Sequence, residues 1–161
     1  MPLAVQAPTE VPPSKPSKKG VIAIVARCTA ENSDAERKYT HAVADLLRVK
    51  LAEDTTITLL PASITDDIVA GFVVPGYVSS GTNELKSVSS KLPSECNILI
   101  VVGPFPKNEG WFQIWIDRPS DLSGVHFDRS VSTIEASGSP ENMVGSGAII
   151  RHDIDVILKT E

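Results

Sequence analysis

An amphipathic helix pattern stands between two short strand-like runs near the start of the chain. Ser33 and Glu36 have the S-x-x-E spacing of a capping box, in which each side chain binds an exposed backbone N–H of the first helical turn. Apolar residues then recur at steps of three and four positions, at Ala35, Tyr39, Ala42, Val43, Leu46, Leu47 and Leu51. The sequence therefore predicts a helix that begins after Ser33 and has one apolar face.

The runs on either side of this helix have the composition of strands. Residues 21–26 are continuously apolar, which is typical of a strand covered on both faces. Residues 56–60 are rich in β-branched side chains and are followed by Pro61. The order of strand, helix and strand predicts a β-α-β opening.

The segment after Pro61 has a weaker pattern, because glycines and prolines interrupt its apolar residues. We expect a short helical turn near residues 66–70 and then a loop. Thr82 or Asn83 then caps a second helix over residues 84–91, which stops before Pro93.

The second half of the chain reads as a series of strands. An apolar run at 96–102 and the β-forming run Trp111–Asp117 predict a hairpin, and residues 125–133 extend it as an edge strand. After a Gly/Ser/Pro loop at 136–147, many β-branched residues favour a last strand over 148–158. The predicted fold class is α/β (α+β): a mixed β-sheet with two packed helices, in which the β-α-β opening is followed by a β-meander.

Residues 1–19 form a leader rich in proline and lysine, a composition that favours extended backbone and cannot form a packed core. We expect this leader to be disordered. Residues 20–161 are long enough for one domain with its own core. The sequence thus predicts one soluble α/β domain behind a spacer-like leader.

Charge and hydropathy exclude several classes of function. The net charge of −5 argues against a nucleic-acid binder, which needs clustered Lys and Arg. No apolar stretch has the length needed to span a bilayer, and the N-terminus lacks the pattern of a secretory signal. A cytoplasmic protein is expected, or a periplasmic one if the chain is a piece of a larger protein.

The chain contains two cysteines, Cys28 and Cys96, each beside an apolar run. Neither they nor the histidines have the close spacing of a metal site, and the glycines form no phosphate-binding loop, so we expect no metal and no cofactor. Cys28 is the candidate nucleophile of an alternative enzyme hypothesis, with His41, His126 or His152 as its base. None of the family-specific sequences around a catalytic cysteine surrounds it, so a non-catalytic chain is preferred.

The run Trp111–Asp117 divides into two faces, because alternate residues of a strand point to opposite sides. One face carries Phe112, Ile114 and Ile116, and the other carries Trp111, Gln113, Trp115 and Asp117. Burial of the all-apolar face turns the tryptophans outward, and Trp is enriched at binding hot spots. We therefore take Trp111, Gln113 and Trp115 as the candidate partner-binding residues. The alternative is that a helix or a second layer covers the tryptophans.

The order of these elements resembles the N-terminal domain of TolB-like proteins, a family related to CsgG-like α/β domains. The resemblance rests on the strand at 21–26, the helix at 39–51, the strand at 57–61, the run 96–103 and the strand within 110–117. The chain departs from the family pattern in residues 62–81 and in its aromatic strand. The resemblance implies a non-catalytic module that docks partner proteins or self-associates.

Overall fold

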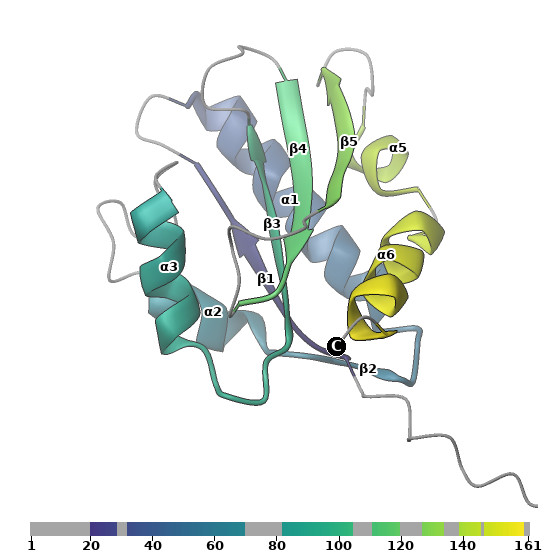
Figure 1. Cartoon of the computed structure of the whole chain (residues 1–161). Helices are drawn as coiled ribbons and strands as arrows, with labels where there is room; N and C mark the ends of the chain where they lie inside the picture. The colour runs from purple at the N-terminus through teal and green to yellow at the C-terminus, as the bar shows by residue number, and fades with distance from the viewer. Residues whose placement is uncertain are drawn as a thin grey trace, which may run out of the picture.

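A mixed sheet of five strands forms the centre of the computed structural model, which describes residues 20–28, 32–69, 82–104, 111–119, 127–133, 139–145 and 147–159 (Figure 1). The strands are β1 (Gly20–Ala26), β2 (Ile57–Leu59), β3 (Ile98–Pro104), β4 (Trp111–Asp117) and β5 (Phe127–Thr133). Their order across the sheet is β2-β1-β3-β4-β5. β1 is parallel to β2 and β3, whereas β3-β4 and β4-β5 are antiparallel. This arrangement confirms the α/β class, the β-α-β opening and the meander.

Helices cover the two faces of the sheet unequally. Those in the described residues are α1 (Asp34–Leu51), α2 (Ala62–Val69), α3 (Thr82–Lys91), α5 (Pro140–Val144) and α6 (Ala148–Lys159). Helices α1, α5 and α6 share one apolar core with the sheet, and α2 and α3 share a second core with β1 and β3. Figure 1 shows α2 and α3 beside β1, and none of the described helices lies over the near face of β4.

Helix α1 begins where the sequence predicts it. The Ser33 hydroxyl accepts a hydrogen bond from the Glu36 N–H at 3.1 Å, and the Ser33 N–H donates to the Glu36 carboxylate at 2.9 Å. Val43, Leu47 and Leu51 then lie buried against the sheet. The capping box and the apolar stripe therefore both have the expected geometry.

The expected strand over residues 148–158 is wrong, because this segment is the helix α6. Ile150, Ile154 and Ile157 are buried at helical spacing, whereas Ile149 is 63% exposed. The β-branched residues favour a strand only by intrinsic propensity, a preference that tertiary burial readily overrides. Here the spacing of the buried isoleucines, and not their side-chain type, decides the structure.

Other boundaries also differ from the sequence-based prediction. Helix α3 begins at Thr82 and ends at Lys91, so the expected caps Thr82 and Asn83 lie within the helix. Helix α2 begins at Ala62, where the Pro61 carbonyl accepts hydrogen bonds from the N–H groups of Ile64 and Thr65, and not at the expected residue 66. The short helix α5, capped by Ser139, occupies part of the expected loop at 136–147. The leader 1–19 and the expected loop at 71–81 lie outside the described residues. No described helix has the length and apolar character required to cross a membrane.

Candidate functional site

The apolar face of β4 is buried, as expected. Phe112, Ile114 and Ile116 are 0% exposed and belong to the core shared with α1 and α6. The Phe112 ring meets the Tyr39 ring of α1 edge to face, with centroids 5.2 Å apart. This face therefore holds β4 in place and turns the opposite face of the strand away from α1.

The opposite face of β4 contains the expected partner-binding residues. Trp115 is half-buried and packs against the second core, whose members include Val88 of α3 and Val101 of β3. Gln113 accepts a hydrogen bond from the Arg27 guanidinium at 3.1 Å. The side chain of Trp111 lies outside the described residues. The structure thus brings Gln113 to the end of β1 and places Trp115 beside the edge of the α3 layer.

Arg27 reaches Gln113 because β1 and β3 approach each other closely. The Arg27 N–H donates to the carbonyl oxygen of Val102 at 2.7 Å, just beyond the end of β1. A Cβ added to Gly103 would lie 2.0 Å from the Arg27 carbonyl oxygen. Only glycine fits at this crossing, so Gly103 helps to set the position of Arg27.

The two cysteines are free and buried. Burial raises the pKa of the Cys28 thiol above its ordinary value, and a hydrogen bond with Thr40 only partly opposes this effect. Burial likewise raises the pKa of the Cys96 thiol. A raised pKa lowers the fraction of thiolate, which is the reactive form of cysteine. Both thiols therefore have the environment of core residues.

The histidines proposed as partners of Cys28 are not gathered around it in the described structure. His41 lines a cleft that does not include Cys28, and His152 is exposed on α6. His126 lies outside the described residues. The described part of the chain also contains no group of three His, Cys, Asp or Glu residues placed to hold a metal ion.

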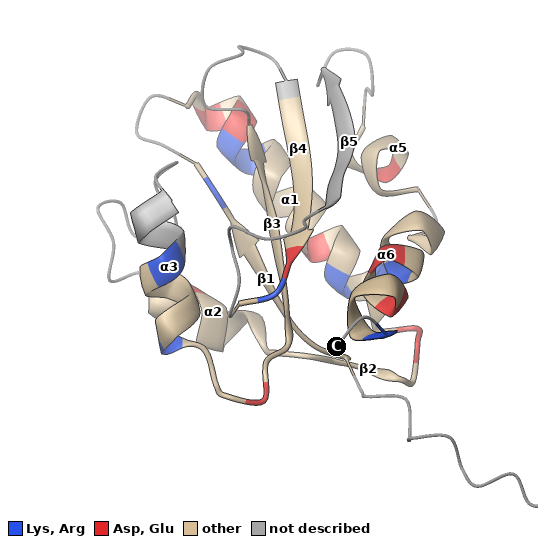
Figure 2. Cartoon of the chain, viewed as in Figure 1, with Lys and Arg blue, Asp and Glu red and all other residues tan. Residues whose placement is uncertain are grey.

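The N-terminus of α1 is occupied by its own capping box. In parallel α/β sheets, the helix that follows the first strand commonly binds phosphate through its free backbone N–H groups. Here the Glu36 carboxylate binds the Ser33 N–H, so an anion would meet a negative charge. Both acidic and basic side chains lie on α1 and on α6, so neither helix carries charge of one sign alone (Figure 2).

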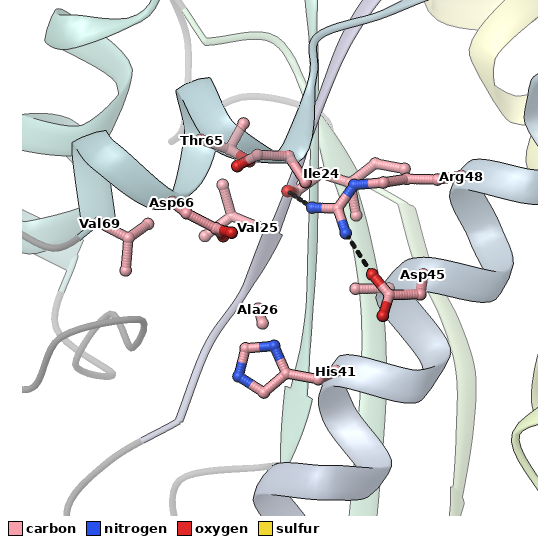
Figure 3. A pocket seen from close by; sticks show the side chains of 11 residues that line it. Ile24, Val25, Ala26, His41, Asp45, Arg48, Thr65, Asp66 and Val69 are labelled. Carbon is pink, nitrogen blue, oxygen red and sulfur yellow. Dashed lines mark hydrogen bonds and ion pairs between the residues drawn. The ribbon is translucent and has the colours of Figure 1, made fainter.

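A polar cleft opens between α1 and α2, where sequence reasoning predicted no site. Its volume is about 150 Å³. Residues 24–26 of β1 form its floor, and the polar side chains on its walls are His41, Asp45, Arg48, Thr65 and Asp66 (Figure 3). In the sequence, the polar residues 41, 45 and 48 recur on one face of the predicted helix. That spacing does not reveal that α2 forms the opposite wall.

Arg48 crosses this cleft to the edge of the sheet. Its guanidinium donates to the carbonyl oxygen of Ile24 at 2.9 Å and to the Asp45 carboxylate at 2.8 Å (Figure 3). Asp66 points from α2 towards β1 on the opposite wall. Asp66 makes no hydrogen bond or ion pair within the described residues.

Comparison with models of protein families, with curated proteins and with solved structures found no match to this chain. The resemblance to TolB-like domains therefore rests on the sequence pattern alone. A ligand can be sought on the face of β4 that carries Gln113 and Trp115 and in the cleft between α1 and α2.

Proposed function

We propose that the chain is a non-catalytic protein-interaction or scaffold module that docks a partner protein on the face of β4 that carries Gln113 and Trp115. The observation that carries this proposal is the position of Trp115, which is half-buried on β4 and packs against the margin of the second core. None of the described helices lies over the near face of β4 (Figure 1). A Trp that is already held against the core loses little conformational freedom on binding, which favours it as an anchor.

The hydrogen bond between Arg27 and Gln113 supports the same surface. Arg27 is 7% exposed and Gln113 is half-buried, so both side chains are already oriented before a partner arrives. Arg and Trp are enriched among residues that contribute most to binding. Pre-organised side chains of these types beside an open sheet face are suited to protein recognition.

The alternative function, a small enzyme with a Cys/His site, has less support. Its nucleophile would be Cys28, whose thiol is 2% exposed and has a raised pKa. A catalytic cysteine needs the opposite properties, namely access to the substrate and a stabilised thiolate.

The proposal is tested by comparing two lysine substitutions in the full-length chain. Gln113→Lys places a second cation beside Arg27 on the proposed surface, and Val49→Lys changes an exposed residue on α1. We expect one constant partner to co-purify with the wild type and with Val49→Lys, but not with Gln113→Lys. Light scattering identifies the case in which that partner is a second copy of the chain.

A spectroscopic measurement locates the contact. The chain has two tryptophans, so Trp111→Phe leaves Trp115 as the single indole fluorophore. Binding of the partner should shift the emission of Trp115 and reduce its quenching by acrylamide. Two results would rule out this face of β4 as the docking surface. One is equal capture of the partner by the wild type, Val49→Lys and Gln113→Lys, and the other is an unchanged Trp115 emission in the complex.

A further inference from the structure

The polar cleft exists because β2 is much shorter than the strand beside it. β2 has three residues and pairs with Gly20, Val21 and Ile22 at the start of β1. The chain then leaves the sheet, since the N–H of Leu60 makes the last bond to the Ile22 carbonyl and α2 begins at Ala62. The rest of the β1 edge therefore faces the space between α1 and α2.

Two carbonyl groups of β1 face this space. In a strand, the backbone groups of successive residues point to alternate neighbours. The N–H of Arg27 bonds to β3, so the backbone groups of Ala26 point to the other side, as does the Ile24 carbonyl. The two residues are separated by about 6.6 Å along the strand. The edge thus presents one acceptor at Ile24 and an equivalent acceptor at Ala26.

The chain's own Arg48 shows what this edge recognises. Its guanidinium joins the Ile24 carbonyl to the Asp45 carboxylate, and so satisfies a strand edge and a negative charge at the same time. A guanidinium suits such a place because it is planar and donates in several directions from one rigid group.

The second half of the cleft repeats this arrangement without the cation. Ala26 lines the floor here, and by alternation along β1 its carbonyl faces the same side as that of Ile24. Asp66 of α2 lines the wall with its side chain turned towards β1, as Asp45 of α1 does on the other side (Figure 3). We propose that this half binds a guanidinium group, which bridges the Ala26 carbonyl and the Asp66 carboxylate as Arg48 bridges Ile24 and Asp45. The group belongs to an arginine side chain of a peptide or to a free guanidinium compound.

Size and charge are consistent with such a ligand. The cleft has a volume of about 150 Å³. This volume would hold about five water molecules at roughly 30 Å³ each, and methylguanidinium has about as many non-hydrogen atoms. Asp45 balances the charge of Arg48, so Asp66 is the carboxylate of the cleft that has no Lys or Arg of the cleft beside it. A guanidinium cation matches both the volume of the cleft and the negative charge of Asp66.

The proposal is tested by titrating the full-length, ¹⁵N-labelled chain and following its amide resonances. Methylguanidinium should cause saturable shifts of Ala26, Thr65 and Asp66 in the millimolar range. Methylammonium has the same charge but is not planar, and urea is planar but has no charge. Neither compound should cause these shifts. A response to methylammonium equal to that to methylguanidinium would overturn the proposal, since it would show only unspecific attraction of cations.

A matched pair of variants on α2 supplies the control. Asp66→Asn should weaken binding about tenfold or more, because a charge-assisted hydrogen bond is lost. Asp67→Asn removes the same charge from the next, exposed residue, which does not line the cleft, and should change the affinity by less than about twofold. Both residues are exposed, so circular dichroism and the thermal midpoint should match the wild type. Equal effects of the two substitutions would overturn the proposal.

The source of the guanidinium is decided by a second ligand. Binding of N-acetylarginine amide at the same resonances supports an arginine side chain, whereas binding of methylguanidinium alone supports a free small compound. Gln113 does not line the cleft, so Gln113→Lys should leave this titration unchanged. The two experiments are therefore independent: the proposal for the cleft can be refuted while that for the docking surface on β4 is supported, and the reverse also holds.

Discussion

The guanidinium of Arg48 donates to the main-chain carbonyl oxygen of Ile24 at 2.9 Å, on the side of β1 that β2 is too short to reach. An open strand edge exposes backbone groups that can pair with another chain, and natural proteins block such edges with charged side chains. Arg48 has this role in the present fold. The same bond holds the last turn of α1 to the sheet.

Replacing Arg48 should destabilise the domain by more than the loss of a surface ion pair. Arg48→Met retains most of the aliphatic length but leaves the Ile24 carbonyl without its charged donor, a loss of about 1.5 to 3 kcal/mol. Asp45→Asn is the control, because the Asp45 side chain is 73% exposed and such pairs contribute at most about 1 kcal/mol. Urea unfolding measures both. Equal free energies of unfolding for the two variants would show that the bond to Ile24 contributes little.

Gly103 should not tolerate even a methyl group. Gly103→Ala places a Cβ 2.0 Å from the Arg27 carbonyl oxygen, so the backbone must move, at a cost of about 1 to 3 kcal/mol. At Gly20 the nearest atom to an added Cβ is 3.5 Å away, an ordinary contact. Gly20→Ala should therefore leave the thermal midpoint unchanged or raise it slightly. A loss of stability at Gly20 as large as that at Gly103 would contradict this account.

Helix α1 and strand β4 were predictable because independent signals agree there. The Ser33 and Glu36 capping box coincides with the start of a 3.6-residue apolar pattern, and both are found in the structure. In β4, alternation correctly separates the buried Phe112 from Gln113. Where propensity and periodicity disagree, as in α6, the sequence alone favoured the wrong element.

The cleft could not be predicted, because its residues come from separate elements. The cleft brings together Ile24, Arg48 and Asp66 because β2 ends after three residues and a new helix follows Pro61. The partial burial of Trp115 has a similar origin. It depends on where α3 packs against the sheet, and the alternation within β4 contains no information on that position.

The cysteines should make the stability of the fold depend on pH in the alkaline range. Burial raises the pKa of both thiols in the folded chain above the ordinary value of 9.0, so the unfolded chain ionises first. The protonated thiols therefore contribute stability that is fully present below pH 9 and is lost as the pH rises through the folded pKa. Urea midpoints from pH 7 to pH 10.5 should fall less steeply for Cys28→Ala with Cys96→Ala than for the wild type.

Alkylation provides an independent check of the same environment. Iodoacetamide at pH 8 should modify Cys28 and Cys96 slowly in the native chain and rapidly in denaturant, because both thiols are buried. Rapid native modification of Cys28 would instead indicate an accessible thiolate, and it would favour the enzyme hypothesis over the interaction module.

Two isoleucines of α6 distinguish a helix from a strand at the end of the chain. Ile154 is 1% exposed and packs in the core, so Ile154→Ala should lower the free energy of unfolding by about 2 to 5 kcal/mol. Ile149→Ala removes the same atoms from a residue that is 63% exposed, and its effect should stay within about 0.5 kcal/mol. In a helix, Ile150 and Ile157 are also core positions, whereas a strand would place them on opposite faces. Only the helix explains a lower free energy of unfolding for alanine variants of both Ile150 and Ile157 together with an unchanged value for Ile149→Ala.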